Sequence, residues 1–154
     1  MTETVTYPFT SRTYVSLSIA RGIAAAQGHS DITAAHIALG ILREGENPAV
    51  AALQLGGVPL RHLRHEIESE LPPAGHPHFG EVVLPTMQGE REMLELAAEE
   101  VAKLNNPYLG NEHLLLAMLS DPAAPIAQVF SRHGITYDTA LTHLRAVFAG
   151  NTAK

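Results

Sequence analysis

The sequence predicts an all-α protein of about eight helices, arranged as two pseudo-symmetric four-helix repeats that pack as one domain. Apolar residues make up 45% of the 154 positions, aromatic residues only 5%, and there is no Trp. Ala and Leu supply most of the apolar residues, which favours close-packed helices over β-sandwiches. Apolar residues also recur at helical spacing between good capping residues. The same pattern occurs twice along the chain, which predicts the two repeats.

A constant offset of 77 positions relates the two halves of the chain without a gap. The offset aligns His36 with His113, Leu17 with Leu94, Leu39 with Leu116, Pro48 with Pro125, Gly57 with Gly134 and Ile67 with Leu144. Because proline and glycine pairs align together with apolar pairs, chance is a poor explanation. The sequence therefore predicts repeat 1 at 8–71, a linker loop at 72–85, repeat 2 at 86–148 and a tail at 149–154.

The first repeat contains four segments with helical periodicity and recognisable ends. They are 12–28, 33–45, 47–57 and 59–71. Ser11 is the expected N-cap of the first helix and Gly28 its end, while Thr33 and Asn47 are the expected N-caps of the next two. Pro48 then occupies the first helical position of the third, where its missing N–H costs nothing.

The second repeat follows the same order. Its expected helices are 88–105, 110–120, 124–133 and 137–148, the third again beginning with an early proline, Pro125. The linker "PPAGHPHFGEVVLP" (72–85) is rich in proline and glycine, which indicates a long loop. A short extended segment is expected at "EVVL" (81–84).

Charge and composition exclude several classes of partner. The net charge of −6 argues against non-specific binding of nucleic acid or of an anionic membrane surface, since both need a basic face. The chain has no Cys, no apolar run long enough to cross a membrane, and no basic and apolar leader at its N-terminus. We therefore expect a cytoplasmic protein.

The sequence contains no coherent catalytic or metal-binding pattern. It has no G-x-x-x-x-G-K-[ST] for phosphate binding, no G-x-S-x-G and no H-E-x-x-H. His62, His65 and Glu66 cluster on one expected helix, and His76 and His78 lie in the linker, but neither group supplies a complete ligand set. We expect a non-enzyme without cofactor or metal; a small hydrolase or metalloenzyme is the alternative.

Three features together resemble a known family. They are "PFTSR" (8–12), the helix start within "LELAAEEVAKLNNPYLGNEHLLLAML" (94–119), and the duplication itself. They resemble the Clp N-terminal domain, the double repeat that precedes the ATPase modules of Hsp100 unfoldases of the ClpC and ClpB types. The resemblance covers about residues 8–148. It implies an all-α module that docks substrates and adaptors and does not itself hydrolyse ATP.

The resemblance also implies candidate binding residues. In ClpC-type domains the glutamate matching Glu112 binds the guanidinium of phosphorylated arginine, and a Phe-Thr pair in the same repeat helps to bind the phosphate. Phe9 and Thr10 match that pair in repeat 1, but Ala35 replaces the glutamate there. In repeat 2, Glu112 is present but "TM" (86–87) replaces Phe-Thr. Each pocket is thus expected to lack one half, and phosphoarginine binding to be weak or absent in repeat 1 and to depend on Thr86 in repeat 2.

Other interpretations of these residues remain open. Glu112 is also explained as a first-turn acid that stabilises its helix. His36 and His113 are expected to be structural, each hydrogen-bonding a backbone carbonyl at a helix start. The remaining candidate ligand residues are Asn111, beside Glu112, and Phe79, which together with Phe9 matches an aromatic groove that receives peptide-like ligands in the ClpC-type relatives.

The predicted function is that of a non-catalytic binding module of the Clp chaperone–protease system. Its expected partners are protein segments or cyclic peptide-like ligands, and a Clp ATPase, its protease or their adaptors. It would deliver substrates or act as a decoy that sequesters them. We expect a stand-alone protein; the alternative is the N-terminal docking domain of a larger ATP-dependent unfoldase.

Overall fold

The computed structural model describes residues 7–73 and 87–152, and within them it contains eight α-helices and no strand. The helices are α1 (Ser11–Ala26), α2 (Ala34–Glu44), α3 (Pro48–Leu55), α4 (Leu60–Ser69), α5 (Gln88–Lys103), α6 (Asn111–Leu119), α7 (Pro125–Ser131) and α8 (Tyr137–Thr152). This confirms the all-α class and the two four-helix repeats. None of the described helices has the length and apolarity to cross a membrane. The expected extended segment at 81–84 lies outside the described residues.

The helix ends lie within two residues of the sequence prediction except for the end of the last helix. The last helix continues to Thr152 instead of ending at 148, so that Gly150 lies inside it with open space around its Cα. A glycine in an exposed helix interior costs only about 1 kcal/mol, which does not end a helix. The fourth helix ends at Ser69 and not at 71.

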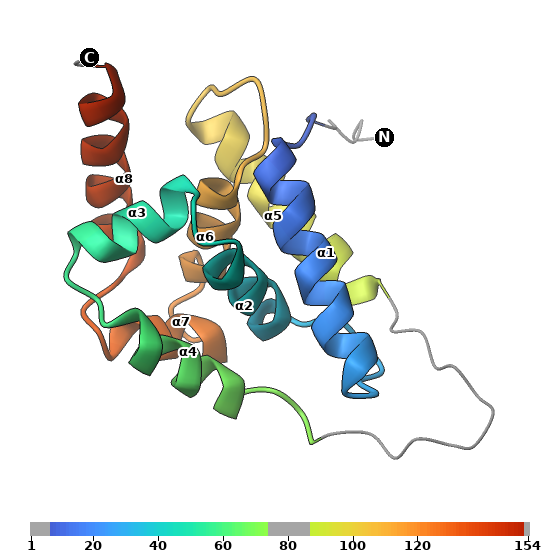
Figure 1. Cartoon of the computed structure of the whole chain (residues 1–154). Helices are drawn as coiled ribbons and strands as arrows, with labels where there is room; N and C mark the ends of the chain where they lie inside the picture. The colour runs from blue at the N-terminus through green and yellow to red at the C-terminus, as the bar shows by residue number, and fades with distance from the viewer. Residues whose placement is uncertain (1–6, 74–86, 153–154) are drawn as a thin grey trace.

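Helices α2 and α6 form the centre of the molecule (Figure 1). All nine residues of α6 are buried, as are seven of the eleven in α2. A helix that is apolar on every side is stable only when other helices surround it. In Figure 1, α1 and α5 lie on one side of this pair, and α3 and α8 on the other.

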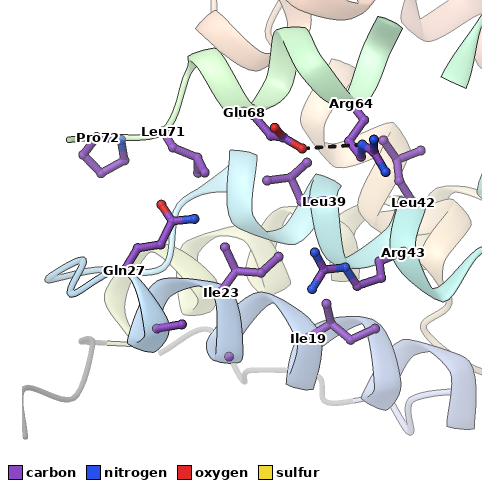
Figure 2. Close-up of a pocket in the computed structure, with 12 residues that line it drawn as sticks. Ile19, Ile23, Gln27, Leu39, Leu42, Arg43, Arg64, Glu68, Leu71 and Pro72 are labelled. Atoms are coloured by element: carbon purple, nitrogen blue, oxygen red, sulfur yellow. Dashed lines mark ion pairs between the residues drawn. The ribbon is translucent and has the colours of Figure 1, made fainter. Parts of the chain in front are cut away.

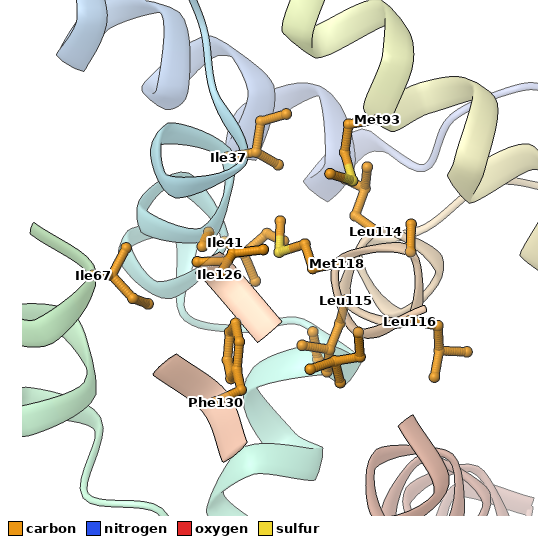
Figure 3. Close-up of a cluster of buried hydrophobic side chains, with 14 of the residues drawn as sticks. Ile37, Ile41, Ile67, Met93, Leu114, Leu115, Leu116, Met118, Ile126 and Phe130 are labelled. Carbon is orange, nitrogen blue, oxygen red and sulfur yellow. The ribbon is translucent and has the colours of Figure 1, made fainter. Parts of the chain in front are cut away.

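One hydrophobic core joins both repeats. Figure 3 shows side chains from five helices meeting in it: Ile37 and Ile41 of α2, Ile67 of α4, Met93 of α5, Leu114 to Leu116 and Met118 of α6, and Ile126 and Phe130 of α7. Phe130 and Leu115 are each 2% exposed. Because the apolar faces of the two repeats are buried against each other, they fold as one body.

The two repeats pack against each other through their third and fourth helices. The third helix of each repeat packs on the fourth helix of the other, α3 on α8 and α7 on α4. Arg21 of α1 also donates two hydrogen bonds, both 2.9 Å long, to the carboxylate of Glu90 on α5. Glu90 is 2% exposed, and a bidentate pair to a buried carboxylate fixes the relative orientation of the two helices.

Gly40 sets the close approach of α1 to α2. A Cβ at this position would overlap the carbonyl oxygen of Ser16 in α1. We expect Gly40→Ala to lower the free energy of unfolding by about 1–3 kcal/mol, because the two helices would have to separate. Gly22→Ala is the matched control. Gly22 lies in mid-helix with open space around it, so the same change should raise stability by up to about 1 kcal/mol. Urea denaturation of both variants measures the difference, and an equal effect at the two sites would contradict the packing argument.

Candidate functional site

The starts of α1 and α6 lie side by side, although they belong to different repeats. The backbone N–H of Thr10 donates to the carbonyl of Leu109 at 3.1 Å, and the N–H of Leu109 donates to the carbonyl of Pro8 at 2.9 Å. These bonds form an isolated parallel bridge between Phe9 and Leu109. The Phe-Thr pair of repeat 1 is thereby joined to the loop that leads into Glu112.

Thr10 is the N-cap of α1, so the expectation that Ser11 caps this helix is wrong. The bridge to Leu109 holds residues 9 and 10 extended, and the helix therefore begins one residue earlier than a Ser11 cap would allow. The N–H of Thr13 donates to the Thr10 hydroxyl oxygen at 3.2 Å, and the two threonine hydroxyls are 2.7 Å apart. The hydroxyl of Thr10 is thus fixed at the helix start.

Glu112 is the second residue of α6 and is only 3% exposed. Burial raises the pKa of its carboxyl above the usual range, while a hydrogen bond from its own backbone opposes the shift. The carboxylate folds back over Gly110, where any Cβ would overlap it. Burial, and in second place the negative charge of Glu112, raises the pKa of the neighbouring Tyr108 hydroxyl. A carboxylate held at a helix start in this way is stabilised by the helix dipole.

Asn111 begins α6 and has unused hydrogen-bonding capacity. Its side chain is 1% exposed, and neither its Nδ2 nor its Oδ1 has a partner among the described residues. Buried side-chain amides are normally paired. The α6 start therefore combines a buried carboxylate with a buried amide that offers both a donor and an acceptor.

His36 and His113 occupy equivalent places, as the third residues of α2 and α6. The Nδ1 of His36 accepts from the N–H of Thr33, and the Nδ1 of His113 from the N–H of Gly110, both at 2.9 Å. The sequence analysis expected a backbone carbonyl as partner, but a helix start presents free N–H groups, so the ring accepts instead of donating.

The other ring nitrogen of each histidine faces a side chain that sequence reasoning missed. The Nε2 of His36 is 2.8 Å from the Nδ1 of His29, and the Nε2 of His113 is 2.8 Å from the Oδ1 of Asn106. His29 and Asn106 are themselves 77 positions apart, which is the signal that would have found them. Burial lowers the pKa of His36 and of His113 to about 4, so both rings are neutral at pH 7.

The Phe-Thr pair of repeat 1 does not lie beside Ala35 of the same repeat, where the sequence analysis expected the two halves of a pocket to meet. Arg12 in the first turn of α1 pairs at 2.8 Å with Glu44, the last residue of α2. The start of α1 is therefore at the opposite end of α2 from Ala35. Thr10 instead lies beside Leu109, in the loop that leads into Glu112 of the other repeat.

At the offset of 77 positions, the starts of α2 and α5 are equivalent to the starts of α6 and α1. We call the region where α2 and α5 begin the second place. There the N–H of Gly89 donates to Asp31 at 3.3 Å, just before α2. This place has Ala35 where the other has Glu112, and Met87 where the other has Thr10. Beside it is a cavity of about 410 Å³ whose walls include Ala35, Met93 and Met118. The second place thus lacks the buried glutamate and the threonine of the first, and its cavity is lined mostly by apolar side chains, with Glu70 and Asp121 also in the wall. Phe79 and Thr86 lie outside the described residues.

Residues 7–73 and 87–152 contain no group of three His, Asp or Glu side chains placed to hold a metal ion. His133 instead contacts Glu66 at 3.0 Å, an interaction that ties α7 to α4.

Comparison with known proteins gives one family. The model of the Clp repeat N-terminal domain matches residues 8–78 and again 88–151. The chain is 29% identical over 143 residues to the negative regulator of genetic competence ClpC/MecB of Bacillus subtilis, and 28% identical over 146 residues to the chaperone ClpB of Oceanobacillus iheyensis. These matches cover 93% and 95% of this chain but only 17% and 18% of the relatives.

Among solved structures, the N-terminal domain of Hsp104 from Candida albicans superposes with a TM-score of 0.69. The match covers 89% of each chain at 18% sequence identity, and at that identity it establishes the fold alone.

The low histidine pKa values predict how stability depends on pH. In the unfolded chain a histidine titrates near pH 6.5, so between pH 6.5 and about 4 the unfolded state binds protons that the folded state does not. The free energy of unfolding should therefore fall with falling pH in this window, by up to about 1.4 kcal/mol per pH unit for each histidine. Urea denaturation at pH 7, 6 and 5 measures this slope.

His113→Gln, which keeps an acceptor for the Gly110 N–H, should make the slope shallower, whereas the exposed His62→Gln should leave it unchanged. Equal slopes in all three proteins would contradict the assignment.

Proposed function

This chain belongs to the Clp repeat N-terminal domain family, and we propose that it is a non-catalytic docking module that captures arginine-bearing protein segments where α1 and α6 begin. The observation that carries the proposal is the junction of Thr10 and Glu112 across the repeats. It places a buried carboxylate next to two helix starts. The family resemblance supplies the ligand class, and the geometry indicates which residues would bind it.

The chemistry of the junction suits a phosphorylated arginine. A guanidinium presents a planar fork of N–H donors that matches a carboxylate, and Glu112 is the carboxylate at this place. A phosphate is stabilised by the free N–H groups and the positive dipole end of a helix, and α1 and α6 both begin here. The unpaired amide of Asn111 adds a donor and an acceptor. Because Glu112 is only 3% exposed, its side chain must turn out from Gly110 to reach a ligand.

In this proposal the second place, where α2 and α5 begin, binds a different class of ligand. The cavity beside Ala35 is bounded by Met93 and Met118, whose flexible side chains adapt to varied apolar ligands. Cyclic or linear peptide-like ligands without a phosphate would bind there. The protein would then have one site that binds a charged ligand and one site that binds apolar ligands, in place of two equal pockets.

The same docking function is compatible with two settings. As a stand-alone protein the module would sequester its ligands by mass action or deliver them to a Clp ATPase and its protease. As part of a larger unfoldase it would dock substrates and adaptors in cis. The chain spans less than a fifth of the length of the curated relatives it matches, and the reading frame beyond Lys154 distinguishes the two settings.

Calorimetric titration with phosphoarginine tests the junction. We expect one binding site per chain, and we expect Glu112→Gln to weaken binding at least about tenfold, because truncating one partner of a buried charge pair typically costs that or more. Exposed Glu99→Gln on α5 is the control and should bind like the wild type. Free arginine should bind more weakly than phosphoarginine. Failure of the wild type to bind phosphoarginine would overturn the proposed ligand, and binding that survives Glu112→Gln would overturn the proposed site.

The cross-repeat pairing makes a gain-of-function prediction. Ala35→Glu together with Met87→Thr should recreate the junction at the starts of α2 and α5, where the adjacent cavity leaves room for a carboxylate. The stoichiometry of phosphoarginine should rise from one to two per chain. Either substitution alone should leave the stoichiometry at one, which is the control. A folded double variant that still binds one ligand would contradict the pairing.

A further inference from the structure

A groove on another face of the molecule lies between α1, α2 and α4. It has a volume of about 880 Å³, which is within the range of ligand sites in proteins. Ile19 and Ile23 of α1 and Leu39 and Leu42 of α2 line its floor, as Figure 2 shows, and its rim is polar. Gln27 and Leu71 stand at the other end of the groove from Leu42. The groove is separate from the junction of Thr10 and Glu112, since it lies along the second half of α1.

Two arginines stand at the Leu42 end of this groove. Arg43 comes from the last turn of α2 and Arg64 from α4 (Figure 2). Arg64 contacts Glu68 at 3.5 Å, but both side chains are about half exposed or more, so the pair is weak and easily exchanged. Arg43 makes no ion pair with any described residue. The Leu42 end of the groove therefore carries more positive than negative charge.

The repeat symmetry does not account for these arginines. The positions equivalent to Arg43 and Arg64 in repeat 2 are Ser120 and Leu141. Leu141 is partly buried and packs against the core. The internal packing of a repeat thus does not require a cation at either position, and the two charges are a property of this groove alone.

We propose that this groove docks an amphipathic helix of a partner protein, one whose apolar stripe is flanked by Asp or Glu. Helical walls on both sides suit a helical occupant, because ridges of side chains pack into the grooves between them. From Ile19 to Gln27 the floor is about 12 Å long, enough for about two turns and for apolar anchors at i and i+4. Carboxylates at one end of the helix pair with Arg43 and Arg64 and fix its direction.

Charge determines the selectivity of this docking. The chain as a whole carries a net charge of −6, so most of its surface repels an acidic partner. The two arginines offer such a partner a favourable place, and complementary charges steer association to it. This proposal is independent of the phosphoarginine site, because it needs neither Glu112 nor a phosphate.

The test uses the full chain and a labelled, Ala-based helical peptide of about 16 residues with leucines at i, i+4 and i+7 and flanking glutamates. Matched peptides carry glutamine or lysine in place of glutamate. Fluorescence anisotropy should show that the glutamate peptide binds at least about tenfold more tightly than the other two. Arg43→Glu with Arg64→Glu should abolish that preference and favour the lysine peptide.

The control variant is Arg91→Glu with Arg145→Glu. Both are exposed arginines away from the groove, and the pair changes the net charge by the same amount. This control should keep the preference for the glutamate peptide, as should Glu112→Gln. Absence of binding by the glutamate peptide, or equal loss in the groove variant and the control, would overturn the proposal.

Discussion

The buried start of a central helix is the constraint on which the rest of this structure depends. Helix α6 is buried at every position, so the N–H groups of its first turn have no water to bond. His113 accepts the N–H of Gly110, the residue just before the helix, through Nδ1 and connects the helix to the preceding loop through Asn106. His36 does the same for α2, with His29 as the second partner. These two histidine-capped central helices give the other six a surface on which to pack.

The same constraint produces the candidate site. A helix start that is buried and only partly satisfied is a place where polar groups of a ligand can be bound strongly. At α6 the histidine takes one N–H group, Glu112 folds back over Gly110, and Asn111 keeps both of its polar atoms unpaired. The bridge between Phe9 and Leu109 then adds the start of α1. Structural capping and the proposed ligand binding thus share one location, which is why sequence reasoning alone could not separate the two interpretations of Glu112.

The sequence predicts the elements well and their neighbours poorly. The periodicity, the prolines at the first helical position and the offset of 77 located all eight helices, because these signals are local or repeated. The offset shows which residues are equivalent, but equivalent residues are not necessarily adjacent. Thr10 lies beside the loop that leads into Glu112 because α1 runs antiparallel to α2 and the two repeats pack against each other, and neither fact is encoded in spacing along the chain. The Thr10 cap was missed for the same reason, since a cross-repeat bridge decides where α1 begins.

Comparison of the two repeats within this chain separates positions set by packing from positions free to differ. Where the fold needs a histidine to cap a buried helix, both repeats have one. The two junctions of helix starts differ. The junction of α1 and α6 has threonine and glutamate, and the junction of α5 and α2 has methionine and alanine. The groove between α1, α2 and α4 differs in the same way. Repeat 1 has Arg43 and Arg64 there, whereas the equivalent positions of repeat 2 hold Ser120 and Leu141. Because a duplicated fold needs its capping and core residues twice but each surface only once, these differences are where distinct ligands for the two halves would be expected.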